Sequence, residues 1–388
     1  MQIKNAKEAL KHCMKCGECQ VVCPSFSVTG RESESARGKV RLIKALLDGE
    51  LKPSKNIVER LSTCHLCKAC SSICPSGVSI DKLIIAARVE LVNKLGLPLY
   101  KKIFFRILEH PKLIPLGIRC ANKFGIFPQN LTSPKKSLKR IISKKVNLRN
   151  SNQKVVFFGG CMINYYYPEV GKISVDILKN NGFNVIINDE KCCGIPAKFS
   201  GDIKSATVNA KENLKNFTGN EIIVTACPTC ALAWKEYPDL FKGKLRKKAS
   251  KLASSTFEIT DFFLKHCNKK VKGIENKIAY HQPCHLKNGL GKKHDLEGIL
   301  EFVGEGEYVE IEDRCCGFGG TFSYEHPDLA EKINDSRIDG INESGVDIVV
   351  TPCPGCKYFI KAGLSRKGLN KKVLHTVELL SMVDELEG

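Results

Sequence analysis

The chain has 388 residues, with 61 Lys and Arg against 41 Asp and Glu, a formal net charge of +20, and 20 cysteines. This length allows two or three domains with a substantial buried core. The cysteine content is too low for a small disulfide-rich scaffold and too high for an ordinary globular domain. The beginning of the sequence has no apolar run like that of a signal peptide, and no segment approaches the roughly 18 apolar residues of a membrane span. We therefore expect a cytoplasmic protein, and in a reducing compartment clustered cysteines bind metal or act as redox groups.

The first quarter of the chain contains the spacing C-x2-C-x2-C-x3-C-P twice, which is typical of ferredoxins with two iron–sulfur clusters. In this pattern three cysteines hold one cluster and the fourth ligates the other. We therefore predict two [4Fe-4S] clusters with crossed ligands. The first is bound by Cys13, Cys16, Cys19 and Cys74, and the second by Cys64, Cys67, Cys70 and Cys23. A pair of zinc sites is the alternative, which the proline-terminated repeat disfavours.

A helix is predicted between these two motifs. Ser35 is a suitable N-cap, Val40, Leu42, Ile43 and Leu46 or Leu47 form an apolar stripe, and Asp48-Gly49 suits the end. With this helix, residues 1–95 resemble the helical ferredoxin of succinate dehydrogenase-type iron–sulfur subunits. The basic residues Arg37, Lys39 and Arg41 either lie near a cluster and offset its negative charge or form a solvated helix face.

Residues 96–150 are expected to form a basic amphipathic linker. From residue 97 to residue 150, thirteen Lys or Arg accompany a single acidic residue, Glu109, and apolar runs such as IFFRIL (103–108) lie between the charges. Such a stretch can lie on an anionic membrane surface. Peripheral contact with the inner face of the membrane is therefore one interpretation. An acidic partner protein and a solvated linker are the others.

Ten further cysteines form one motif that occurs twice. The two copies are Cys161, Cys192, Cys193, Cys227 and Cys230, and Cys284, Cys315, Cys316, Cys353 and Cys356. The offset is 123 residues for the first three cysteines and 126 for the last two, and the segment 257–264 resembles 374–381. A duplication of this length indicates two homologous half-domains, which we place at residues 151–268 and 269–388.

Each copy alternates short β-branched runs with helical stretches. Alternation of this kind indicates parallel sheets with helices on both faces, and the carboxyl ends of such strands form the site. Because the cysteines follow the strands, five thiolates per copy should converge at one sheet edge, with Gly194 and Gly317 allowing the vicinal pairs to turn. The strands are expected at 154–158, 184–188 and 221–225, and at 277–281, 308–312 and 346–350. Helices between them are expected at 288–302 and 328–343.

Several residues outside the motifs need separate interpretations. His281 and His285 flank Cys284 and either tune a metal centre or relay protons, or simply pack at the strand end. Cys120 and Cys267 belong to no motif and are expected to be buried small residues. Trp234 follows Cys230 on an expected helix and should pack in the core.

The combination of motifs resembles a known family of redox proteins. The family includes the iron–sulfur subunits of glycolate oxidase and D-lactate dehydrogenase, and the corresponding CCG-containing polypeptides of anaerobic glycerol-3-phosphate dehydrogenase and heterodisulfide reductase. The resemblance covers nearly the whole chain. It implies a helical ferredoxin domain with two [4Fe-4S] clusters, followed by two α/β CCG half-domains. In these half-domains the ten cysteines would hold one or two further noncubane clusters, or zinc.

The resemblance also implies a function in electron transfer. In such complexes a flavoprotein oxidises the substrate, and the iron–sulfur subunit passes electrons to quinone or another acceptor. The preferred interpretation is the electron-transfer subunit of an FAD-dependent 2-hydroxyacid dehydrogenase, acting on glycolate or D-lactate, with no catalytic residues of its own. The main alternative is a heterodisulfide reductase-type protein, in which a noncubane cluster cleaves a disulfide.

A nucleic-acid-binding zinc protein is the remaining class, prompted by the net charge of +20. The cysteine spacing matches no nucleic-acid finger, and few aromatic residues accompany the basic ones, so no nucleic-acid partner is predicted. The GFGG sequence at 317–320 lacks the lysine and the spacing of a phosphate-binding loop.

Overall fold

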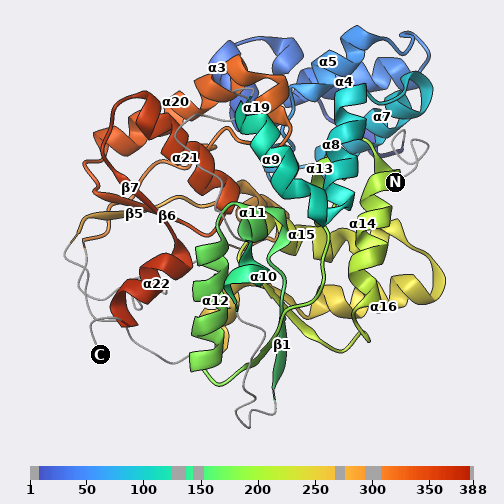
Figure 1. The fold of residues 1–388 in the computed structure, drawn as a ribbon. Helices are drawn as coiled ribbons and strands as arrows, with labels where there is room; N and C mark the ends of the chain where they lie inside the picture. Colours follow the sequence, from blue (N-terminus) through green and yellow to red (C-terminus); the bar gives the residue numbers. More distant parts are fainter. Residues whose placement is uncertain (1–7, 124–136, 143–152, 267–275, 293–306, 385–388) are drawn as a thin grey trace.

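The computed structural model describes residues 8–123, 137–142, 153–266, 276–292 and 307–384 (Figure 1). In Figure 1 the N-terminal helices lie at the top, the first α/β copy lies below them in green and yellow, and the second copy lies to the left in orange and red. The three parts therefore lie against one another, and each is described below in chain order.

The N-terminal part is built from helices alone within its described residues. They are α2 (Glu18–Val21), α3 (Pro24–Thr29), η1 (Glu32–Glu34), α4 (Ala36–Leu47), α5 (Lys55–Ser62), α6 (Ala69–Ser72) and α7 (Ile80–Leu95). The predicted helix between the cysteine motifs is α4. The Ser35 hydroxyl accepts a hydrogen bond from the Gly38 amide at 2.9 Å, and Gly49 follows the helix with a left-handed φ of 81°. Val40 and Ile43 are buried, so the predicted cap and apolar stripe are confirmed.

The basic stretch after α7 forms helices where it is described. They are α8 (Leu99–Glu109), η2 (Pro111–Leu113), α9 (Ile114–Lys123) and α10 (Leu138–Ile141). Residues 124–136 and 143–150 of the predicted linker lie outside the described residues. None of the helices in the described ranges combines the length and the apolar character that crossing a membrane requires.

The first α/β copy contains a four-stranded parallel sheet in the order β2-β1-β3-β4. Its strands are β1 (Lys154–Phe157), β2 (Asn184–Ile186), β3 (Ile222–Thr225) and β4 (Thr256–Glu258). Its helices are α11 (Gly160–Tyr165), α12 (Pro168–Asn180), α13 (Ile195–Phe199), α14 (Ile203–Lys215), α15 (Pro228–Glu236), η3 (Tyr237–Leu240), α16 (Gly243–Ser254) and α17 (Ile259–His266). The three predicted strands are confirmed, and β4 is one that the sequence prediction missed.

The second copy contains a three-stranded parallel sheet in the order β5-β6-β7. Its strands are β5 (Ile278–Tyr280), β6 (Ile348–Thr351) and β7 (Lys372–His375). Its helices are η4 (His285–Gly289), α19 (Phe322–Glu325), α20 (Pro327–Glu343), α21 (Pro354–Arg366) and α22 (Thr376–Asp384). The predicted strands at 277–281 and 346–350 and the helix at 328–343 are confirmed, and β7 was not predicted.

One prediction for the second copy needs correction, and another lies mostly outside the described residues. The stretch 308–312 is not a strand, because it contributes only an isolated bridge between Tyr308 and Ile278. Beyond this bridge, the Glu312 carbonyl accepts a hydrogen bond from the guanidinium of Arg337 instead of from a neighbouring strand. The helix expected at 288–302 is seen only as the end of η4, a single π-helical turn, and its residues from 293 onward lie outside the described residues.

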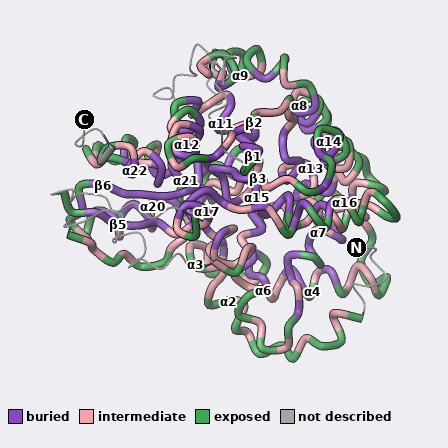
Figure 2. Tube along the Cα trace, turned by 90° about the horizontal axis from the view of Figure 1, so that it is seen from below, coloured by how far each residue is buried: buried purple, intermediate pink, exposed green. Residues whose placement is uncertain are grey.

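The core joins the N-terminal part to the first copy. One cluster of buried apolar residues includes Ile43 and Leu83 together with Ile223 and Trp234, which is fully buried as predicted. The opposite face of the same sheet packs against α12 and α22, the last helix of the second copy. Figure 2 shows this buried interior running through the strands of both sheets.

A charged contact also crosses this boundary. Glu236 at the end of α15 lies 2.6 Å from Lys68 of the second cysteine motif and 2.7 Å from Lys198 of the first copy. Burial raises the pKa of Glu236, but the two lysines more than offset that effect and lower it to about 2. The second cysteine motif is therefore anchored to the first copy by an ionised, hydrogen-bonded carboxylate.

Candidate metal centres

The two N-terminal cysteine loops share an unusual backbone shape. Lys15 (φ 60°) and Leu66 (φ 56°) occupy the same motif position, and Gly17 (φ 93°) and Lys68 (φ 63°) occupy another. A left-handed conformation costs a residue with a side chain roughly 1–2 kcal/mol, so three such residues in two short loops indicate a functional constraint. Turns of this kind point successive amides toward one side, where they suit an anionic group. Of these four residues, only Gly17 is of a type that commonly adopts this conformation, so the sequence alone did not predict the shape.

The structure places the first motif beside Cys74 of the second. The thiol pKa of Cys19 is raised to about 11 by burial and by the neighbouring charges of Cys13, Cys16 and Cys74. Cys74 accepts a hydrogen bond from the Val78 amide at 3.4 Å. We propose that Cys13, Cys16, Cys19 and Cys74 are the ligands of one cluster.

The second group surrounds a small cavity. This cavity, of about 20 Å³, is lined by Cys23, Cys64, Cys67 and Cys70. Burial raises the pKa of Cys23 to about 11 and that of Cys67 to about 12. Thiols this reluctant to ionise become thiolates when a metal cation replaces the proton, so the donor set fits an iron–sulfur cluster. We propose these four cysteines as the ligands of the second cluster, with Cys23 supplied by the first motif.

Buried cations lie beside the second group. Lys39 is 1% exposed and donates a hydrogen bond to the Glu34 carbonyl at 2.6 Å. Burial raises the pKa of the Cys64 thiol, and the charges of Arg88 and Lys39 act in the opposite direction. Both cations are thus placed to offset the negative charge of a bound cluster.

The three basic residues predicted on α4 therefore have different environments. Lys39 lies beside the second group of cysteines. Arg37 lies beside the first motif, because its Nη1 atom would be 3.4 Å from a side chain added at Gly17. Arg41 is exposed, so the solvated interpretation holds for that residue.

Replacing Lys39 with Met should lower the reduction potential of the second cluster by about 40–85 mV. A buried unit charge several ångströms away contributes roughly 1–2 kcal/mol at an effective dielectric constant of about 20. For one electron, each 1.4 kcal/mol corresponds to about 59 mV. Without the cation, the more negative reduced state is less stable. A redox titration followed by electron paramagnetic resonance measures the change.

The exposed Arg41→Met variant is the matched control and should shift the potential by less than about 20 mV. Glu34 keeps a partner in the Lys39 variant, since Arg60 lies 3.0 Å from it. Equal shifts in the two variants would show that Lys39 has no special influence on the cluster.

The thiols of the first α/β copy form a connected group. The Sγ atoms of Cys161 and Cys192 are 3.9 Å apart. Cys193 contacts both Cys192 and Cys230, and Cys230 contacts Cys227. The five cysteines expected to converge at one sheet edge are therefore close together, and we propose them as metal ligands.

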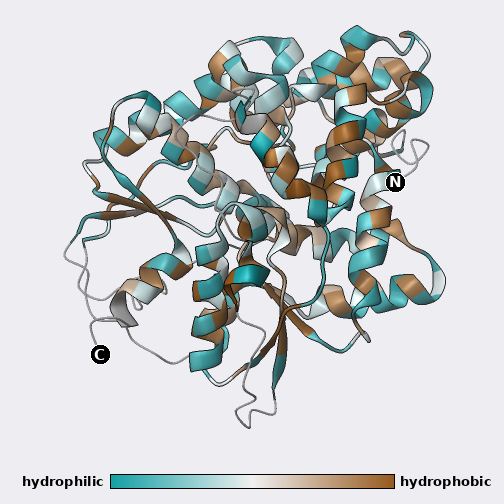
Figure 3. Cartoon of the chain, in the orientation of Figure 1, coloured by the Kyte–Doolittle hydropathy of each residue, from teal (hydrophilic) through white to brown (hydrophobic). Residues whose placement is uncertain are grey.

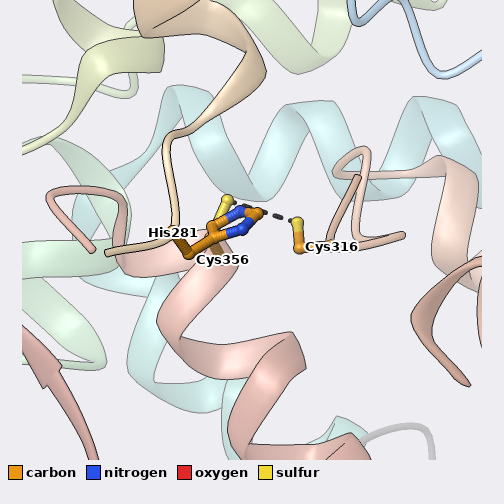
Figure 4. A group of neighbouring side chains, drawn as sticks. All are labelled: His281, Cys316 and Cys356. Atoms are coloured by element: carbon orange, nitrogen blue, oxygen red, sulfur yellow. Dashed lines mark hydrogen bonds between the residues drawn. The ribbon is translucent and has the colours of Figure 1, made fainter. Parts of the chain in front are cut away.

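The second copy repeats this arrangement and adds a histidine. The Sγ atoms of Cys316 and Cys356 are 3.2 Å apart, and Cys315 and Cys353 contact this pair. The His281 ring has a ligand atom within 4.8 Å of the sulfurs of Cys316 and Cys356 (Figure 4). His281 directly follows β5, Cys356 lies on α21 after β6, and Cys316 belongs to the vicinal pair. His281 therefore faces the candidate centre.

A glycine follows each vicinal cysteine pair in the same conformation. Gly194 and Gly317 both have a φ of 84°, as expected for residues that let the pair turn. A side chain at Gly317 would lie 2.5 Å from the Ala330 carbonyl oxygen. Gly160, which the sequence prediction did not single out, has a φ of 62° and approaches the Cys230 sulfur so closely that a Cβ would lie 2.7 Å from it.

The thiol groups of the two copies meet each other. Cys227 of the first copy and Cys353 of the second are in side-chain contact. Burial raises the pKa of Cys284 well above its ordinary value, and the nearby thiols of Cys315 and Cys67 contribute to this. The second copy thus contacts both the first copy and the Cys64–Cys70 loop of the N-terminal part.

His65 connects that loop to the second copy. Its Nε2 atom lies 3.3 Å from the Cys315 sulfur, and it follows Cys64 directly in the sequence. Asn288 donates a hydrogen bond to the Cys67 carbonyl at 3.1 Å. The sequence prediction missed His65, because a histidine between two motif cysteines gives no sign of a partner 250 residues away.

The remaining sequence predictions have mixed outcomes. His285 contacts Thr229 at 2.8 Å and the Leu66 carbonyl at 3.3 Å, so it bridges the three parts of the chain, and it also lies close enough to Cys353 to lower the pKa of that thiol. The expectation that Cys120 is buried is wrong. It lies exposed on α9, whose buried residues Ile114 and Ile118 face the opposite way. Cys267 lies outside the described residues.

Comparisons with known proteins match this organisation. The model of a 4Fe-4S dicluster domain matches residues 9–78, and the model of the cysteine-rich CCG domain matches residues 155–235 and 278–361. The chain is 26% identical to the probable glycolate oxidase iron-sulfur subunit of Bacillus subtilis, over 96% of this chain and 93% of that protein. It is 32% identical to Lactate utilization protein A of B. subtilis, over 59% of this chain and 99% of that protein.

Two further similarities cover nearly the whole chain. A fumarate reductase (CoM/CoB) subunit of Methanothermobacter marburgensis is 28% identical, over 96% of this chain and 72% of that protein. A crystal structure of a hypothetical protein from Helicobacter pylori superposes with a TM-score of 0.59 at 11% identity, covering 98% of this chain and 72% of that one. At this identity the structural similarity shows the fold alone.

Proposed function

The chain belongs to the family of iron–sulfur proteins that includes the glycolate oxidase iron-sulfur subunit and Lactate utilization protein A, and it is an oxidoreductase subunit with a 4Fe-4S dicluster domain and two CCG domains. From this premise we propose that it is the electron-transfer subunit of an FAD-dependent 2-hydroxyacid dehydrogenase complex. Its partner oxidises glycolate or D-lactate, and quinone or another acceptor receives the electrons. When bound, the clusters supply one-electron carriers.

One observation carries this proposal: the cysteine groups are contiguous from the N-terminal part to the first α/β copy. The loop that contains Cys67 lies against Cys284 and Cys315, and Cys353 lies against Cys227. A subunit that conducts electrons needs its carriers close together in a buried row. The buried Lys39 and the half-buried Arg88, which donates a hydrogen bond to the Cys64 carbonyl, place positive charge beside such carriers.

The proposed division of labour between subunits rests on the names of the relatives. Two of these relatives are named as subunits of glycolate oxidase or of a fumarate reductase. We therefore assign substrate chemistry to a separate FAD-containing subunit.

A second candidate function is supported by the two CCG sites. The thiols of the first copy form one connected group, and in the second copy four cysteines contact one another with Cys284 nearby. His281 adds an imidazole beside Cys316 and Cys356. This arrangement favours the heterodisulfide reductase-type alternative, in which a disulfide substrate is reduced at a CCG centre. One relative is named as a CoM/CoB fumarate reductase subunit, and this name is consistent with thiol chemistry in part of the family.

Anaerobic purification from the native host tests the main proposal. The protein is expected to co-purify with an FAD-containing protein, and adding glycolate or D-lactate should bleach the visible iron–sulfur absorbance of the complex within seconds. An organic disulfide added to the reduced protein alone is the test of the alternative. Reoxidation by the disulfide, with no bleaching by either hydroxyacid, would favour the second function and contradict the first.

A further inference from the structure

The apolar residues on the inward faces of helices α8 and α9 are already buried. On α8, Phe105 and Leu108 are buried, and α8 packs against α14. On α9, Ile114 and Ile118 are buried, and Gly117 packs against Ile107 of α8, since an added side chain there would lie 3.3 Å from it. The outward faces of such helices are ordinarily polar, because the apolar stripe of each helix is already buried against its neighbours.

The outward faces are instead apolar. Leu99 is 71% exposed, Tyr100 59%, Ile103 54% and Leu116 59%. Leu95, Phe104 and Leu113 are also exposed. Figure 3 shows hydrophobic residues, in brown, along α8 and α9 in this region. We call these seven residues the apolar patch. A patch of neighbouring exposed apolar residues on a folded chain marks a contact surface.

Exposed basic residues lie on the same helices as the apolar patch. They are Lys102, Arg106, Lys112, Arg119 and Lys123. The acidic residue of α8, Glu109, is buried and paired with Arg106 at 2.9 Å. Asp189, which lies near Lys112, is paired with Lys139. These helices therefore present exposed apolar side chains together with positive charges.

We propose that α8, η2 and α9 form a surface that docks on an anionic lipid bilayer, with the apolar patch inserted at the headgroup boundary. Exposed aliphatic and aromatic residues with flanking Lys and Arg are the chemistry of helices that lie in a membrane interface. A soluble acidic partner would match the charges but would leave unexplained why leucines and isoleucine occupy the outward positions. The bilayer matches both.

This surface lies next to the second candidate cluster. A cavity of about 50 Å³ is lined by residues 96–98 and Lys101 at the start of α8 and also by Cys64 and His65. Leu95, Leu99 and Tyr100 flank the same segment. Docking would therefore hold the Cys64 group near the lipid surface. The inference rests on the proposed function to this extent, because a quinone acceptor resides in the bilayer.

Co-sedimentation of the cluster-loaded, full-length protein with vesicles tests the proposal. One set of vesicles is phosphatidylcholine, and the other contains about one-third phosphatidylglycerol. The wild-type protein should bind the anionic vesicles at low salt and lose affinity as salt rises. Ile103→Asp and Lys102→Glu should each lower the partition coefficient by about 10- to 30-fold.

Matched controls are Leu51→Asp, an exposed leucine after α4, and Lys247→Glu, an exposed lysine on α16. These should bind like the wild type. Binding that ignores lipid charge, equal losses in patch and control variants, or no binding at low salt would overturn the proposal. So would a patch variant that changes only the oligomeric mass, which would make this face an interface between copies.

A separate assay keeps docking distinct from the proposed function. Protein that has been reduced and freed of reductant is mixed with a water-soluble quinone analogue, without vesicles. The patch variants should reduce it as fast as the wild type. A wild-type protein that binds anionic vesicles but fails to reduce the analogue would refute the quinone acceptor while supporting the docking surface.

Discussion

Replacing Cys74 with Ser is expected to remove the cluster held by Cys13, Cys16 and Cys19, although Cys74 belongs to the other motif. The serine hydroxyl ionises far less readily than a thiol and is a poorer ligand for iron. The cluster of Cys64, Cys67 and Cys70 should remain, because its fourth ligand is Cys23. The expected result is a loss of about four iron atoms per chain, with one of the two ferredoxin signals retained.

The structure supports this crossed arrangement from both sides. Cys74 lies close enough to Cys19 to raise its thiol pKa, together with Cys13 and Cys16. Cys23 lines the same cavity as Cys64, Cys67 and Cys70. Each fourth cysteine thus reaches across to the other motif, which also ties the two motifs together.

Iron analysis and electron paramagnetic resonance of anaerobically purified variants measure the outcome. Cys23→Ser is the reciprocal variant and should lose the other signal. Cys120→Ser changes an exposed cysteine of α9 and should leave both signals intact. If Cys74→Ser and Cys23→Ser abolish the clusters of their own motifs instead, the ligands are not crossed.

Local sequence patterns were sufficient to predict much of the fold. Short β-branched runs predicted β1, β2, β3, β5 and β6, because all five strands are parallel and all except the edge strand β2 are largely buried. The cap at Ser35 predicted the start of α4. The stretch 308–312 was predicted in the same way, yet only Tyr308 bridges to β5, and the Glu312 carbonyl accepts a hydrogen bond from Arg337. Tertiary contacts of this kind have no local signal in the sequence.

The candidate site was predictable as a set of cysteines, but its connections were not. Spacing identified each group, while the contacts of His65 with Cys315 and of Cys227 with Cys353 depend on how three parts of the chain pack. The left-handed conformations of Lys15, Leu66 and Lys68 were equally invisible, because these residue types rarely adopt them.

The two α/β copies are expected to hold separate metal centres, despite their contact. Within each copy, the vicinal pair meets a cysteine of the same copy. Cys193 contacts Cys230, and Cys316 lies 3.2 Å from Cys356. The contact between copies involves Cys227 and Cys353, which follow equivalent strands. One cysteine from each copy at the boundary fits two neighbouring centres better than one shared centre.

Cys193→Ser should therefore empty the first copy and leave the second loaded, and Cys316→Ser should do the reverse. Each variant is expected to lose about half of the metal that remains after the two ferredoxin clusters are counted. Metal analysis for iron and zinc, combined with Mössbauer spectroscopy, distinguishes a cluster from a zinc ion in each copy. The ferredoxin signals serve as the internal control for folding and should persist in both variants. If either substitution empties both copies, the ten cysteines form one shared centre, and the row of carriers proposed for electron transfer is shorter by one.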